Sequence, residues 1–198
     1  APAVFTCHDF VVWHDSPPPF PQIRRFIAVD QTVFDRLTVR EGTPIERTRI
    51  LLNAVDLSRH VRTAPLPATA TRALLIAKGH RYIAAVTEAC NKRGLTLEKI
   101  GPSAQVVDSP GASAAGQHIV FASARSALEA MATGCAVIAC DDRGLAGMVT
   151  TDRLPDWRPL NFGLRSLRRP VTVDNLLAEI DQYNAADATT VSDWIRED

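Results

Sequence analysis

The sequence predicts an α/β fold in which helices flank a parallel sheet. From residue 73 onward, short runs of β-branched and apolar residues alternate with helix-length amphipathic segments, as parallel strands and their crossover helices do. The chain has 198 residues, of which 46% are hydrophobic, so it can bury a core of its own. No internal repeat or low-complexity tract competes with this interpretation. We therefore expect one α/β domain and part of a second.

The first 53 residues predict the partial domain. Two early strands are followed by the proline-rich segment 16–21. We predict a turn there, because proline cannot join the interior of a strand ladder. A later segment has the apolar spacing of an amphipathic helix, which Gly42 ends. The expected elements are strands at 3–7, 10–13, 26–29 and 50–52 and a helix at 31–41.

Residues 54–72 predict a linker, since polar and small residues surround Pro65 and Pro67 there. We therefore place a partial N-terminal domain at 1–53 and a C-terminal domain at 73–198. In the C-terminal domain, Gly94 closes the first helix. The expected strands lie at 73–77, 104–107, 119–122 and 136–140, and the expected helices at 81–93, 124–133, 173–183 and 188–196. Such an arrangement is a Rossmann-like parallel sheet with flanking helices.

The charge balance argues against nucleic acid as a partner. Lys plus Arg and Asp plus Glu both total 22, so the formal net charge is zero. No general electrostatic attraction to nucleic acid or to an anionic membrane follows, and phosphate binding must be local. Peripheral membrane contact stays open.

Cysteine usage indicates a reducing compartment, because the four cysteines include no CxxC pair and two fall in an expected buried strand. They are Cys7, Cys90, Cys135 and Cys140. No charged-then-apolar leader is seen, and the longest apolar run is interrupted by charges, so we expect a cytoplasmic protein. The dipeptides His8-Asp9 and His14-Asp15 lack a clear third ligand, so we expect no metal site.

A nearly continuous apolar stretch at 119–140 carries Arg125 and Glu129 in its middle. Burying an unpaired charge is costly, so we expect both to face a cleft or a ligand. Ser123 is a candidate N-cap for the helix that follows, whose first turn holds Arg125 and Ser126. Free backbone N–H groups, a guanidinium and a hydroxyl there favour a phosphate or diphosphate. An i,i+4 ion pair between Arg125 and Glu129 is the alternative that the sequence leaves open.

Two more loops fall at the same edge of the expected sheet. Lys78, beside Gly79, follows the first strand of the C-terminal domain and could offset charge on a diphosphate; an exposed loop lysine is the alternative. Asp141 and Asp142 follow strand 136–140, where ligands of such folds collect. For this pair a turn with solvated charges is the alternative.

Three segments resemble one known family. Residues 123–139 read Ser-Ala-Arg-Ser-Ala-Leu-Glu-Ala-Met-Ala-Thr-Gly-Cys-Ala-Val-Ile-Ala. They resemble the donor-site segment of GT-B glycosyltransferases, especially the retaining family-4 group. Asn53-Ala-Val-Asp56 resembles the Asn-Gly-Val-Asp junction between the two domains of that family, and Ile76-Ala-Lys78-Gly79 resembles the glycine-lysine turn that opens its second domain.

The resemblance implies transfer of a sugar from a nucleoside diphosphate sugar to the hydroxyl of an acceptor, with retention and with no further cofactor. A glycan or a lipid-linked molecule is the acceptor class it suggests. The implied roles are ribose binding by Glu129, diphosphate binding by Lys78, Gly79, Arg125 and Ser126, and lining of the sugar pocket by His8, our candidate at the catalytic centre. Because such enzymes have two full domains, we expect the chain to be a piece of one, and an exposed face leaves self-association open.

The sequence also departs from the family. Phe121 stands where the family commonly has an earlier glutamate, separated from the ribose-binding one by seven residues. Ile76 and Ala77 stand where an arginine commonly precedes the lysine. We find no convincing general base or nucleophile. Two alternatives therefore remain, a non-catalytic domain that binds a nucleotide sugar or a partner, and a nucleotide-sugar epimerase of the same architecture.

Overall fold

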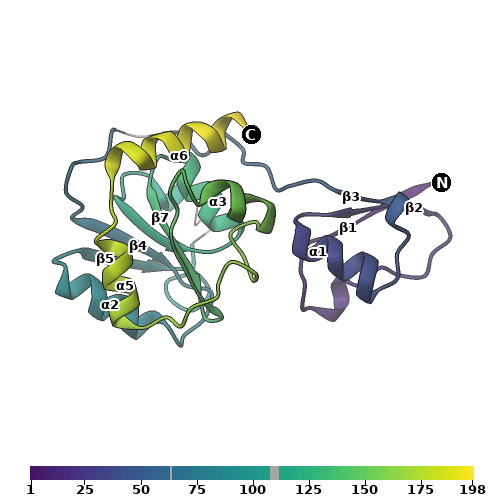
Figure 1. Cartoon of the computed structure of the whole chain (residues 1–198), viewed down its shortest axis with the longest axis horizontal. Helices are drawn as coiled ribbons and strands as arrows, with labels where there is room; N and C mark the ends of the chain where they lie inside the picture. The colour runs from purple at the N-terminus through teal and green to yellow at the C-terminus, as the bar shows by residue number, and fades with distance from the viewer. Residues whose placement is uncertain (63, 108–111) are drawn as a thin grey trace. The chain divides into compact units, whose positions relative to one another are not determined.

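The computed structural model describes residues 1–62, 64–107 and 112–198, and by its contacts the chain divides into two compact units (Figure 1). The smaller unit comprises Ala1–Asn53 with Pro159–Asn161, and the larger one Ala54–Arg158 with Phe162–Asp198. The described part of 54–72 is thus grouped with the larger unit, and its Val55, Leu57 and Leu66 pack against the cores there.

The smaller unit is built on a three-stranded parallel sheet in the order β1-β2-β3. Its strands are β1 Ala3–Cys7, β2 Ile23–Ala28 and β3 Thr48–Ile50. Its helical turns are η1 Trp13–Asp15, α1 Gln31–Asp35, the π-helical turn η2 Arg36–Arg40 and η3 Ile45–Arg47. Its small core consists of Cys7, Ala28, Val29, Val33 and Leu37.

Side chains decide where the elements of the smaller unit begin and end. Asp30 caps α1 by accepting a hydrogen bond of 2.7 Å from the Val33 N–H. Gly42, at a φ of +68°, follows the helical segment as expected. The strand predicted at 10–13 is wrong. The Asp9 carboxylate takes up the N–H groups of Val11 and Val12 at 2.6 and 3.1 Å, so they are not available to a strand ladder.

The larger unit contains a five-stranded sheet in the order β5-β4-β6-β7-β8. The strands are β4 Arg72–Ile76, β5 Thr96–Ile100, β6 Ile119–Ala122, β7 Ala136–Asp141 and β8 Gly144–Met148. All pairings are parallel except that of β7 with β8, which is antiparallel. The predicted α/β architecture is therefore confirmed. The chain leaves β4 toward β5 on one side and then returns to β6 on the other, so the strand order reverses between β4 and β6.

Helices cover both faces of this sheet. The helical segments of the larger unit are α2 Ile83–Lys92, η4 Ala112–Ala114, α3 Arg125–Ala132, α4 Leu154–Trp157, α5 Val173–Ile180 and α6 Ala185–Glu197. The 3-10 turn η5 Arg158–Leu160 begins in the larger unit, and its last two residues are grouped with the smaller one. Side chains of α3 and α6 share one buried cluster with Leu74 and Val120, and those of α2 and α5 share another with Leu75 and Phe121 (Figure 1). Neighbouring residues of β4 and of β6 thus point to opposite faces, as strand geometry requires.

Two edges of the sheet differ from the prediction. The strand expected at 104–107 is wrong, because 96–100 forms the edge strand β5, and Gln105 makes only an isolated bridge to Ile100. An edge strand tolerates exposed charges such as Glu98 and Lys99. Because of these charges, β5 lacks the apolar pattern from which strands were predicted. The other edge strand, β8, is also missing from the prediction, since its sequence Gly-Leu-Ala-Gly-Met carries two glycines.

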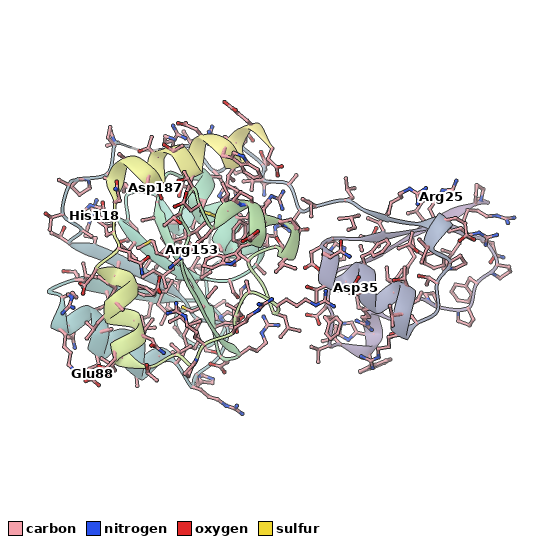
Figure 2. All side chains as sticks on the ribbon, viewed as in Figure 1. Arg25, Asp35, Glu88, His118, Arg153 and Asp187 are labelled. Atoms are coloured by element: carbon pink, nitrogen blue, oxygen red, sulfur yellow. The ribbon has the colours of Figure 1, made fainter. Side chains whose placement is uncertain are left out.

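A buried carboxylate explains why position 147 of β8 is a glycine. A Cβ atom at Gly147 would lie 2.4 Å from Oε2 of Glu179 on α5. Glu179 accepts hydrogen bonds from the Met148 N–H at 2.7 Å, from Arg153 Nη1 at 2.9 Å and from Arg169 (Arg153 is labelled in Figure 2). Burial alone raises the pKa of Glu179, but these three donors outweigh it, and the pKa lies below the ordinary value of 4.5.

We expect Glu179→Gln to lower the free energy of unfolding at neutral pH by about 1.5 to 3 kcal/mol, the range for hydrogen bonds to a charged group. Because the folded-state pKa is depressed, this stabilisation is present above pH 4.5 and is lost as the pH falls through the folded-state value. Urea unfolding of both proteins at neutral and acid pH measures it. The difference in free energy of unfolding between the two proteins should be smaller at acid pH. A difference that is independent of pH, or equal to that of the exposed Glu197→Gln, would contradict the assignment.

Candidate functional site

The candidate site lies where the strand order of the larger unit reverses. In open α/β sheets, ligands bind outside the carboxyl ends of the strands at such a reversal. The loop after β4 contains Lys78 and Gly79, and the turn after β6 consists of Ser123 and Ala124 before α3 starts. Lys78 Nζ donates a hydrogen bond of 2.6 Å to the carbonyl oxygen of Ser123, so the two loops meet across the reversal.

Lys78 is the cation at the centre of this edge. The residue as a whole is exposed, but its ammonium group turns back onto the protein, where it meets the Ser123 carbonyl. Burial of the ammonium lowers the pKa of Lys78, and the negative charge of Asp141 opposes that change. Arg143 lowers the pKa further, and Glu129 raises it. Lys78 therefore lies within the electrostatic reach of two carboxylates, one on β7 and one on α3.

Asp141 is the third polar group at this edge. Its carboxylate is buried, so the alternative of a turn with solvated charges does not hold for Asp141. It ends β7, is 3% exposed, and accepts a hydrogen bond of 2.7 Å from the Ser123 hydroxyl. Arg143 Nη2 lies 2.6 Å from the same carboxylate. Burial by itself raises the pKa of Asp141, but the hydrogen bonds from Arg143 and Ser123 outweigh it, so the pKa lies below the ordinary value of 3.8. The Asp141 carboxylate is therefore ionised at neutral pH, next to Lys78 and Ser123.

The interpretation of Ser123 as the N-cap of α3 is wrong, because its hydroxyl serves Asp141. The N-cap is Ala124, which makes no side-chain cap hydrogen bond and has φ +52° and ψ −134°. A residue with a side chain is strained in this region, and strain of that kind gathers at functional turns. The Ala124 N–H donates to the Phe162 carbonyl at 3.1 Å, which holds the turn.

Helix α3 brings Arg125, Ser126 and Glu129 to the same edge. Arg125 Nε lies 2.9 Å from Glu129 Oε1, so the two form the i,i+4 ion pair that the sequence left open. The side chain of Arg125 is 72% exposed, whereas that of Glu129 is 14% exposed. Arg125 therefore reaches into solvent, and the carboxylate stays against the fold. Glu129 is thus paired with Arg125 on α3 and lies within the electrostatic reach of Lys78 in the loop after β4.

Gly79 allows a second contact along this edge. A Cβ atom at Gly79 would lie 1.9 Å from Oδ2 of Asp142, in the turn between β7 and β8. The other oxygen of Asp142 accepts a hydrogen bond of 3.0 Å from the Arg81 N–H. The absence of a side chain at Gly79 lets these two loops pack together, so its role here is close approach.

His8 belongs to the smaller unit, directly after β1. Its backbone N–H and that of Asp9 both donate to the Asp15 carboxylate, which fixes the loop that carries it. Among the described residues, no three His, Cys, Asp or Glu side chains are grouped to hold a metal ion. The described helices include none that is both long enough and apolar enough to span a membrane.

All four cysteines are free and buried. Burial raises the pKa of Cys7 and of Cys90 to about 12 and that of Cys135 to about 11. The pKa of Cys140 is raised as well, again chiefly by burial. These thiols are therefore packing groups, and they offer no thiolate for chemistry near neutral pH.

The sequence singled out Asp141 by its position at the carboxyl end of β7, but it did not single out Arg143 and Ser123 as the partners of that carboxylate. Ser123 follows β6, and Asp141 ends the neighbouring strand β7. The hydrogen bond of 2.7 Å between them depends on the pairing of these two strands, which no local sequence pattern contains.

We expect Asp141→Asn to lower the pKa of Lys78 further, because the variant loses the carboxylate charge that favours the ammonium. The pH dependence of acylation at Lys78 in the folded protein, followed by peptide mass mapping, measures this. Asp174→Asn is the control, since the Asp174 charge acts on Lys92 instead. If both variants leave the pKa of Lys78 unchanged, the link from Asp141 through Ser123 to Lys78 is wrong.

Comparison with known proteins gives similarity in structure only. No protein-family model and no curated protein matches the sequence. The chain is similar to the crystal structure of a glycosyltransferase from Rickettsia africae ESF-5, with a TM-score of 0.57 and 13% identity, over 88% of this chain and 57% of that one. It also matches the glycotransferase of kitacinnamycin, with a TM-score of 0.44 and 13% identity, over 88% of this chain and 50% of that one.

The chain thus spans less than two thirds of the length of either structure. At this level of identity the similarity to the Rickettsia protein concerns the fold. The chain is an α/β protein with parallel sheets flanked by helices, and it resembles glycosyltransferase domains.

Proposed function

We propose that the larger unit binds the nucleoside diphosphate part of a nucleotide sugar and that the chain is part of a retaining GT-B glycosyltransferase. The observation that carries the proposal is the meeting of Lys78, Arg125 and Glu129 at the reversal between β4 and β6, the place where open α/β sheets bind ligands. The resemblance to glycosyltransferase domains supports the same choice of ligand.

Each of these side chains suits one part of such a ligand. An exposed guanidinium at the start of α3 and an ammonium one loop away are the cations that a diphosphate requires. A half-enclosed carboxylate one helical turn later accepts hydrogen bonds, as the two hydroxyls of a ribose need. The ligand would replace the Arg125 to Glu129 pair by two contacts of its own.

Cleavage of the bond between sugar and diphosphate leaves negative charge on the departing diphosphate. Lys78 and Arg125 would stabilise that charge as it develops, which lowers the barrier without a protein nucleophile. In this proposal His8 lines the sugar pocket. The acceptor is a hydroxyl compound, and a carbohydrate or lipid-linked acceptor fits the proposed reaction.

Calorimetric titration with UDP, GDP, ADP and their sugar conjugates tests the donor site. We expect one nucleotide series to bind, and Glu129→Gln to weaken it about tenfold or more, roughly 1.4 kcal/mol. Glu88→Gln is the matched control, because Glu88 forms the same i,i+4 pair with Lys92 on the outer side of α2 (Figure 2). Failure of every nucleotide to bind to the folded chain, or equal effects of the two variants, would contradict the proposed site.

The diphosphate contacts can be separated from the ribose contact. We expect Lys78→Met and Arg125→Met each to weaken the nucleoside diphosphate about tenfold, while the affinity for the matching nucleoside changes little, because only the diphosphate needs the cations. Titrations at rising ionic strength should show a smaller salt dependence in both variants. Equal losses for nucleoside and diphosphate would instead mean that the substitutions disturb the fold.

Turnover separates the transferase from its alternatives. A transferase slowly releases free sugar from its donor with water as acceptor, an epimerase converts the donor into its epimer, and a binding domain does neither. The sugar nucleotide that binds is incubated with the chain or with its His8→Ala variant. Chromatography of the reaction products then distinguishes these outcomes.

A further inference from the structure

Glu129 has a second neighbour that the proposed donor site does not use. His60 comes from the segment 54–72, is 5% exposed, and lies with Nε2 3.9 Å from Glu129 Oε1. That separation lies within ion-pair range and is longer than a hydrogen bond. The other ring nitrogen, Nδ1, is buried and has no hydrogen-bond partner among the described residues.

The backbone fixes His60 against the helix that carries Glu129. The His60 N–H donates to the Asp56 carbonyl at 3.0 Å. Arg196 Nη1 donates both to the His60 carbonyl, at 3.0 Å, and to the Ala132 carbonyl at the end of α3, at 2.9 Å. One guanidinium from α6 therefore ties the histidine segment to α3. These contacts hold the backbone of His60 beside the end of α3, and the imidazole is buried there.

The two candidate partners of Glu129 differ in their freedom. The side chain of Arg125 is 72% exposed, and that of His60 is 6% exposed. An exposed guanidinium is able to turn toward a diphosphate, whereas an enclosed imidazole stays in place. A carboxylate that gives up Arg125 needs another donor on the protein side, because an unpaired charge with little exposure is costly.

We propose that His60 is a positioning residue that holds the Glu129 carboxylate toward a ribose once Arg125 has turned to the diphosphate. The inference rests on the proposed nucleotide site and adds a residue to it. A small rotation of the Glu129 side chain closes the gap to Nε2, so one carboxylate oxygen is held by His60 and the other is presented to the ribose hydroxyls. The donor atom must then be Nε2–H.

The tautomer can be measured without any nucleotide. Two-bond nitrogen–proton correlation spectra of the ¹⁵N-labelled chain, assigned with His60→Phe, report which ring nitrogen carries the proton. We expect the Nε2–H form near neutral pH, because the Glu129 carboxylate faces Nε2 and Nδ1 has no hydrogen-bond partner among the described residues. An Nδ1–H form would overturn the proposal, since Nε2 would then have no proton to donate.

Binding energies give the decisive test. His60→Phe keeps a ring of similar size and removes the donor, and His60→Gln restores an amide N–H at a comparable reach. The probes are UDP, GDP and ADP and their 2′,3′-dideoxy forms. We expect His60→Phe to weaken the bound ribonucleotide about fivefold to tenfold, His60→Gln to recover most of that loss, and the dideoxy form to lose little. His118→Phe, at the outer edge of the larger unit, is the control (Figure 2).

A double-mutant cycle excludes a purely structural role. If His60 acts through Glu129, His60→Phe has no further effect in the Glu129→Gln background. Losses that add, or that are equal for ribose and dideoxy forms, overturn the inference and leave the nucleotide site standing. If the unchanged chain binds none of the three nucleotides, the proposed function and this inference fail together.

Discussion

The meeting of two loops across the strand reversal is the constraint on which the rest of the larger unit depends. Lys78 after β4 reaches the Ser123 carbonyl after β6, and the Ser123 hydroxyl in turn reaches the buried Asp141 at the end of β7. Three strands are therefore joined at their carboxyl ends by polar contacts, next to the two apolar clusters of the core. A buried carboxylate needs such partners, so separation of the loops would cost Asp141 the hydrogen bond from Ser123 and leave Arg143 as its remaining partner.

This arrangement also accounts for the strained turn at Ala124. With its hydroxyl committed to Asp141, Ser123 cannot cap α3, and the chain must turn sharply to start the helix one residue later. The helix then begins without a side-chain cap, and its first residues, Arg125 and Ser126, face the same edge as Lys78. The energetic cost at Ala124 is offset by the contacts that the turn aligns, which is the usual relation between strain and a functional turn.

The sequence predicts the buried middle of the fold better than its edges. Strands β4, β6 and β7 are continuous apolar runs between turn signals, and they were predicted nearly to their ends. The edge strands β5 and β8 were not predicted, because neither has the apolar pattern of a central strand. β5 carries the solvent-facing Glu98 and Lys99, and β8 carries two glycines. Their places are set by tertiary contacts, such as the packing of Glu179 against Gly147, which no local pattern encodes.

The same distinction applies to the candidate site. Lys78, Arg125 and Glu129 could be identified from charge in apolar surroundings and from order along the chain, whereas the roles of Asp141 and His60 depend on contacts between distant segments. His60 in particular lies in a stretch whose composition indicates a linker, and only its burial against α3 makes it notable.

The enclosed thiols have a practical consequence for spectroscopy. At neutral pH almost none of the native cysteine is present as thiolate, and all four side chains are buried, so reagents that attack thiols will find little to modify in the folded chain. A cysteine introduced at an exposed position of each unit would therefore be labelled selectively, with the native four left in place. Fluorescent or spin labels attached in this way would measure the distance between the two units with and without a nucleotide.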